Sequence, residues 1–209
     1  SFAVPVTLAA TGSPGAAARV DNNTAGAIPG VGQITRTFAV SGVSSAIARV
    51  EVSLHITHTR SRDLDITLIS PDGTQVLLAS NNGSGSDTNY GISCPDGSRT
   101  YFNDGAATSI NSAPAPYVGS FRPEQPLTSF IGMSGTNVNG TWTLLIEDVS
   151  GGGMSGTFQC ASLFVYPVEC APGGGLCELC PNTTLTGALG AGSLQHSNRI
   201  VLDGITSTC

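Results

Sequence analysis

The sequence contains no lysine, and only 11% of its 209 residues are charged. Its eight arginines are outnumbered by fourteen acidic residues, so the formal net charge is −6. A phosphate backbone would find no basic stripe on such a chain, and we expect no nucleic-acid partner. No apolar run reaches the ~20 residues of a membrane-spanning helix, so we also predict no transmembrane segment. Ser1 begins without a signal peptide, which indicates that one was removed or that none existed.

Glycine and proline are abundant, with 27 and 12 residues, and 40% of the chain is hydrophobic. This composition favours a turn-rich, all-β globular protein over a helical or disordered one. The length suits one domain of common size with a smaller appendage.

Apolar and polar residues alternate through the middle of the chain, as in a sheet with one buried face. In residues 50–57 the even-numbered apolar positions are predicted to point inward, and the odd-numbered positions outward. Residues 64–68 and 76–78 continue the pattern after a turn at Ser-Pro-Asp-Gly 70–73. Trp142 begins a further alternating stretch and is expected to pack in the core.

Three parts follow from this pattern. Residues 34–166 are predicted to form a β-sandwich that contains a long, loop-rich segment after Ser80. Residues 1–33 form an N-terminal extension with one strand candidate, FAVPVTLAA. Residues 167–209 form a Cys/Gly-rich linker and a short β segment, which has too few strands to bury a face alone.

The six cysteines form an even set, which favours disulfides and an oxidising compartment. The other interpretation is a zinc site, because Cys177 and Cys180 have ligand-like spacing. A second matched pair is missing and no histidine lies close by, so disulfides are preferred. The disulfide candidates are Cys94, Cys160, Cys170, Cys177, Cys180 and Cys209.

Four motifs in series carry a family resemblance: ITHTRSRDLDITLISPDGTQVLL (56–78), FNDGAATSI (102–110), GSFRPEQPLTSFIG (119–132) and NGTWTLLIEDVSGGGMSGTFQCASLFV (139–165). In order and spacing they resemble the P domain of subtilisin-like proprotein convertases. The resemblance covers about residues 34–166. It implies an antiparallel β-sandwich of jelly-roll type, here followed by a small disulfide-stapled β appendage at the C-terminus. In that family the module usually follows a subtilisin-like catalytic domain and stabilises or regulates it.

The chain departs from the family pattern at three places. Its turn has Ser61-Arg62-Asp63 where Gly-Asp is typical, and Ala161 stands where a Trp is common. An insert that contains Cys94 interrupts the long loop. Because Cys160 lies on the last predicted strand, a Cys94–Cys160 bridge would pin this insert to the sandwich.

The sequence offers no assembled hydrolase site, so we predict no catalytic residues and a non-enzymatic protein. The resemblance implies that acidic positions in the long loop can coordinate a metal, and calcium suits such oxygen-rich loops. The predicted ligands are Asn82, Asp87 and Asp104. The alternative is that Asn and Asp occur there because they stabilise turns. The charged turn at 59–65 is interpreted as structural, with exposed ion pairs.

Two functions are preferred over a third, a carbohydrate- or protein-binding module, because the one Trp is expected to be buried and no aromatic platform is evident. The first is an extracellular or cell-surface structural or adhesive protein whose copies self-assemble into a filament by β-strand exchange, since the strand-like flanks lack local partners. Its partners would be other copies of itself or extracellular protein. The second is the accessory P domain of a secreted subtilisin-like serine protease.

Overall fold

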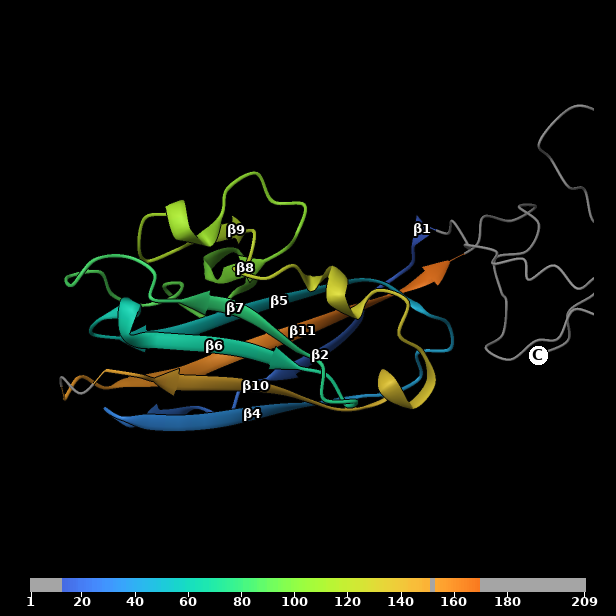
Figure 1. Ribbon diagram of the computed structural model, residues 1–209, viewed down its shortest axis with the longest axis horizontal. Coiled ribbons are helices and arrows are strands. Elements are labelled where there is room, and N and C mark those ends of the chain that lie inside the picture. Colours follow the sequence, from blue (N-terminus) through green and yellow to red (C-terminus); the bar gives the residue numbers. More distant parts are fainter. Residues whose placement is uncertain (1–12, 151–152, 170–209) are drawn as a thin grey trace, which may run out of the picture. The chain divides into compact units, whose positions relative to one another are not determined.

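The computed structural model describes residues 13–150 and 153–169, which form two β-sheets packed face to face (Figure 1). None of the helices in these residues is long and apolar enough to cross a membrane. The predicted all-β class is confirmed, whereas the jelly-roll connectivity and the C-terminal appendage stay predictions. The helices are short 3₁₀ turns: η1 (Ser61–Asp63), η2 (Asp96–Ser98), η3 (Ile110–Ser112), η4 (Leu127–Phe130) and η5 (Gly135–Asn137).

The larger sheet is built around two long strands, β5 (Ile47–His58) and β11 (Gly156–Glu169). These strands pair antiparallel, and the short strands attach on either side of them. One pair, β8 with β9, is parallel. The short strands are β1 (Ser13–Pro14), β2 (Ala18–Asn22) and β3 (Gly26–Ile28) beside β11, and β8 (Thr100–Phe102) and β9 (Gly119–Phe121) beyond β5.

The smaller sheet has the order β4-β10-β6-β7 and lies in front of β5 and β11 in Figure 1. All of its pairs are antiparallel, and β10 pairs with β4 without a break from Gly140 opposite Val40 to Asp148 opposite Gly32. Its strands are β4 (Gly32–Val40), β6 (Leu64–Ile69), β7 (Gln75–Ser80) and β10 (Gly140–Asp148).

The core lies between the two sheets and is formed by the apolar residues of the predicted alternation. Leu64, Ile66 and Leu68 of β6 are fully buried between the sheets, as are the even-numbered residues of β10 from Trp142 to Ile146. The Trp142 indole donates to the Val138 carbonyl at 2.9 Å, so its one polar group is satisfied within the core. The predicted turn at 70–73 joins β6 to β7, and Gly73 supplies its positive φ of +89°.

Residues 18–22 and 26–28 belong to the larger sheet. Within the predicted N-terminal extension, residues 1–33, β2 and β3 pair with β11 over Asn22–Ala18 and Ile28–Gly26. Two short strands with weak alternation carry little signal of their own, and the pairing comes from a partner more than a hundred residues away. The FAVPVTLAA candidate and the predicted strands beyond residue 169 lie outside the described residues.

Candidate functional site

Asn82, one of the predicted calcium ligands, is a buried structural residue. Its Nδ2 donates to Asn111 Oδ1 and to Glu124 Oε1, both at 2.8 Å, and its Oδ1 accepts from the Tyr90 hydroxyl at 3.3 Å. Burial raises the pKa of Tyr90 well above its ordinary value, and the Tyr117, Glu124 and Asp65 charges add to the effect. The amide thus joins the end of β7 to two later segments of the long loop.

Asp87 and Asp104 stabilise backbone turns at separate places. Asp87 Oδ2 accepts from the Ser84 N–H at 2.6 Å, which closes the turn after β7. Asp104 accepts from the Leu127 and Thr128 N–H groups at 2.9 and 2.8 Å, so its carboxylate caps the start of η4.

Each of the three predicted ligands thus accepts a hydrogen bond from the protein through its side-chain oxygens. None of them is hydrogen-bonded to another through its side chain, and the described residues contain no group of three or more His, Cys, Asp or Glu side chains placed to hold a metal. The side-chain contacts fit the turn-stabilising alternative, and calcium binding stays a prediction.

The charged turn at 59–65 is more buried than its sequence suggests. Asp63 is only 4% exposed, and its nearest cation is Arg60, at 3.6 Å from Nη1 to Oδ2. Asp63 Oδ2 and Asp65 Oδ1 are buried without a hydrogen bond. The expected exposed pairs are therefore replaced by a turn that is packed against the following loop, where Ser61 N–H donates to the Asp87 carbonyl at 2.8 Å.

A buried His–Asp pair lies next to this turn and had no signal in the sequence. His58 Nε2 lies 3.1 Å from Asp148 Oδ2, and both side chains are fully buried. The other ring nitrogen lies 2.7 Å from the Arg60 carbonyl oxygen. Both nitrogens are thus engaged in structural contacts, and neither His58 nor His55 bonds to a serine or cysteine side chain in the described part of the chain.

A surface depression of about 350 Å³ opens beside His58, where β5 ends and β11 begins. Its wall is rich in hydroxyl groups and carries no carboxylate. The lining residues include Thr57, Thr59, Thr88, Asn89, Ser155 and Thr157.

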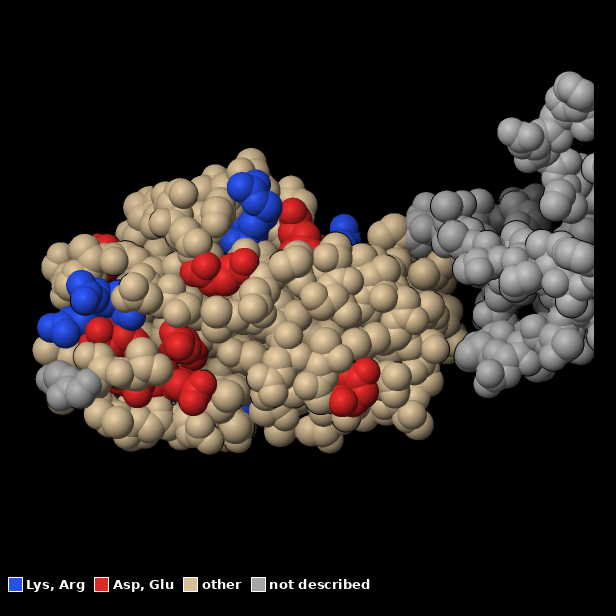
Figure 2. Space-filling model, in the orientation of Figure 1, with Lys and Arg blue, Asp and Glu red and all other residues tan. Residues whose placement is uncertain are grey.

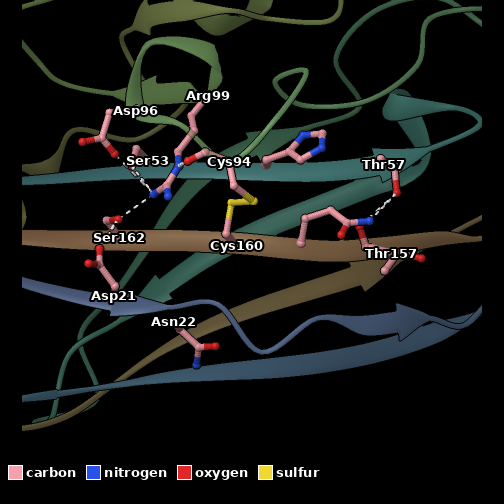
Figure 3. The surroundings of a disulfide bond; sticks show 12 residues. Asp21, Asn22, Ser53, Thr57, Cys94, Asp96, Arg99, Thr157, Cys160 and Ser162 are labelled. Carbon is pink, nitrogen blue, oxygen red and sulfur yellow. Dashed lines mark hydrogen bonds and ion pairs between the residues drawn. A yellow bond between two sulfur atoms is a disulfide. The ribbon is translucent and has the colours of Figure 1, made fainter.

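The Cys94–Cys160 disulfide is present, as predicted, and links the long loop to β11 (Figure 3). It closes a segment of 66 residues, with the two Cα atoms 6.0 Å apart. The other four candidates, Cys170, Cys177, Cys180 and Cys209, lie outside the described residues.

A buried arginine lies beside the disulfide on the outer face of the larger sheet (Figure 3). Arg99 is 5% exposed, and its Nη1 donates to Ser162 Oγ at 2.6 Å and to Ser53 Oγ at 3.3 Å. Burial lowers its pKa. Because a buried guanidinium requires partners, these bonds fix the loop on β5 and β11.

An ion-pair network continues from Arg99 to β2. Arg19 binds both carboxylate oxygens of Asp96 at 2.7 and 2.9 Å, and it contacts Asp21 at 2.8 Å. The Arg19 hydrogen bond is the main cause that lowers the pKa of Asp96. Partial burial opposes ionisation of Asp21, but hydrogen bonds from Ser162 and Arg19 outweigh it and lower that pKa as well.

A second polar cluster fastens the loop two residues along β5 from Ser53, on the same face. The Glu51 carboxylate on β5 is nearly buried and accepts from Tyr101 at 2.6 Å, Tyr166 at 2.7 Å and Asn103 at 2.7 Å. Burial, and then the hydrogen bond to Glu51 and its charge, raise the pKa values of both tyrosines. Arg49 lies over the Tyr166 ring at 3.9 Å and so covers one aromatic face.

A family model described as the proprotein convertase P-domain matches residues 47–164, more than half of the chain. The comparison with curated proteins found no match. Two solved structures of the serine protease of Aeromonas sobria are similar, each with a TM-score of 0.39. The one in complex with a chaperone is 18% identical and covers 73% of this chain, and the protease alone is 19% identical and covers 71%. The matched region spans 27% of each of those chains.

Proposed function

The chain belongs to the proprotein convertase P-domain family, and from this premise we propose that it is a non-enzymatic structural or adhesive module that acts outside the cell through contacts with other polypeptides. The observation that carries the proposal is the contrast between its two sheets. The larger sheet is fastened under the long loop, whereas β4, an edge strand of the smaller sheet, pairs with no further strand in the described part of the chain and has only the Asn22 and Arg36 side chains on its Thr37 and Thr35 carbonyls. A strand edge that is capped only by side chains can accept strand addition when those side chains move aside.

The disulfide supports an extracellular location, because such bonds persist in oxidising compartments. The buried polar groups support a structural role. The His58–Asp148 pair, the Arg99 network and the Glu51 cluster all hold elements of the fold together.

Self-assembly into a filament by β-strand exchange is the finer form of this proposal. It is supported by the β4 edge, which pairs with no further strand in the described residues, and by the strand-like patterns at both ends of the sequence. Electron microscopy of the purified 209-residue chain is the test, with and without chelator. Ordered assemblies are expected, and isolated particles at all concentrations with no affinity for extracellular protein would contradict the proposal.

A second candidate, the accessory domain of a secreted subtilisin-like serine protease, is favoured by the family match itself. P domains are accessory, non-catalytic domains of such proteases. The gene that encodes this chain decides between the two functions. A subtilisin-like catalytic domain upstream in the same reading frame would support the accessory role.

A further inference from the structure

One end of the smaller sheet carries an exposed apolar pair. β10 pairs with β4 as far as Asp148 opposite Gly32, and Val149 and Val31 follow directly beyond this last pair. Their exposed fractions, 60% and 68%, are the two highest among the large apolar side chains of the described residues. Single exposed apolar residues are common, but two that extend from the same end of one strand pair form a patch that a partner can cover.

An arginine without a partner lies beside this pair. The Val149 N–H donates to the Asp63 carbonyl at 2.9 Å, which places the η1 turn and its exposed Arg62 next to the valines. Arg62 makes no hydrogen bond and no ion pair in the described residues, whereas every other arginine there has at least one polar partner. Arginine is enriched in protein–protein interfaces, so a free guanidinium at this position suits a contact site.

Two carboxylates without a cation lie on the outer face at the same end. Asp65 on β6 is opposite Glu147 on β10, and by the two-residue repeat both side chains point away from the core. Neither makes an ion pair in the described part of the chain, although like charges at opposite positions of neighbouring strands repel. Figure 2 shows arginine and acidic atoms gathered at the end drawn at left, whereas the middle of the face is mostly uncharged.

We propose that this surface binds the same surface of a second copy of the chain around a two-fold axis near the valines. The surface, called the end patch here, consists of Val31, Arg62, Asp65, Glu147 and Val149. In this arrangement the valines of the two copies cover one another. Arg62 of each copy faces Asp65 and Glu147 of the other, so each unpaired charge gains an opposite charge.

The charges favour a second copy over an unrelated partner, because the end patch carries both signs and its own chain leaves them unpaired. A two-fold contact brings each sign of one copy to the other sign of its partner. The apolar pair with charges around it also has the usual anatomy of an interface, an apolar centre and a polar rim. Because few residues take part, the interface is small and the dimer is expected to be weak.

The contact uses the same patch on both copies, so it closes into a pair. The inference rests on the proposed function and deepens it by naming a second copy as the partner at this end of the smaller sheet. A filament would need a second, different contact.

The first experiment measures association of the full 209-residue chain by analytical ultracentrifugation over a range of protein and salt concentrations. The wild type is expected to form dimers that weaken as salt screens the charges. Val149→Ser is expected to weaken them about tenfold, because each dimer loses the apolar surface of two valines. Val118→Ser is the matched control, since Val118 is 41% exposed but lies in the long loop. A wild type that stays monomeric, or equal weakening by both variants, overturns the proposal.

The second experiment exchanges the charges. Arg62→Glu and Glu147→Arg are each expected to lose the dimer, because like charges then meet across the axis. Their equimolar mixture is expected to restore it, because the new glutamate of one variant faces the new arginine of the other. Gln75→Glu is the control, since Gln75 is exposed at the opposite end of the same sheet, and it is expected to leave the dimer unchanged. A mixture that stays monomeric contradicts the two-fold arrangement.

These outcomes are separable from those of the proposed function. Assemblies seen by electron microscopy that persist in Arg62→Glu would reject the end-patch dimer but keep a structural role. Dimers that form no larger assembly and bind no extracellular protein would keep the end-patch dimer and reject the proposed function.

Discussion

The Cys94–Cys160 bridge is expected to be a large contributor to the stability of the sandwich. It spans 66 residues, from the long loop to the last strand. In the chain-entropy account, a cross-link of this length removes about 15 cal/mol/K of entropy from the unfolded chain, or about 4 kcal/mol at 25 °C. Domains of this kind have a total stability of ~5–15 kcal/mol, so the loss is a large fraction of it.

The perturbation is the double variant Cys94→Ala with Cys160→Ala, compared with each single variant. Equilibrium unfolding in urea gives the free energy of each protein. Because one cysteine is enough to lose the bridge, each single variant is expected to lose about 4 kcal/mol, and the second substitution adds little. The m-value is expected to rise, since the unfolded chain becomes less compact.

The result that refutes this reasoning is a double variant within about 1 kcal/mol of the wild type. Additive losses in the two single variants would also refute it, because they would indicate side-chain packing of the buried Cys160 rather than a cross-link.

Three further predictions concern the polar clusters. Glu51→Gln is expected to lower the free energy of unfolding by about 3 kcal/mol, because it weakens the charge-assisted hydrogen bonds from Tyr101, Tyr166 and Asn103. The control is Glu147→Gln, because the Glu147 carboxylate makes no hydrogen bond in the described residues. Equal effects of the two substitutions in urea unfolding would contradict the role of Glu51. Asp104→Ala is expected to cost about 1–2 kcal/mol equally in calcium and in chelator, because it removes the cap of η4; a loss confined to calcium-containing buffer would instead support the calcium prediction. The pKa values of Asp21 and Asp96 are lowered in the folded state. Their contribution to the free energy of unfolding is therefore present above the ordinary Asp pKa of ~3.9 and is lost as the pH falls further. From pH 6 to pH 2 the free energy of unfolding should fall less steeply in Asp21→Asn and in Asp96→Asn than in the wild type.

The strands that the sequence predicted well are those with strict alternation. Residues 50–57, 64–68 and 142–146 each have apolar side chains at every second position, and each forms a strand with that set buried. The turn at 70–73 is also a local matter, because Pro71 and Gly73 fix its backbone. Local pattern and burial agree there, so sequence alone is sufficient.

The buried polar contacts could not be predicted from local sequence pattern, because they join segments that are distant in the sequence. His58 and Asp148 are ninety residues apart, and Arg99 is buried only because Ser53 and Ser162 come together on neighbouring strands. The odd-numbered residues of β5 were expected to face solvent, and they do lie on the outer face. The Glu51 and Ser53 side chains are nevertheless buried, because the loop folds back over them. Nothing in the alternation indicates that cover.

The way the loop is fastened decides which surface of the module is available to a partner. The disulfide, Arg99 and Glu51 hold the loop against the outer face of β5 and β11, at three points along that face. The same loop continues to Glu124 and Gln125, which close the β7 edge of the smaller sheet. A single segment therefore covers one face and one edge. This loop does not cover the outer face of the smaller sheet, so we expect a protein partner to contact that face rather than the outer face of β5 and β11.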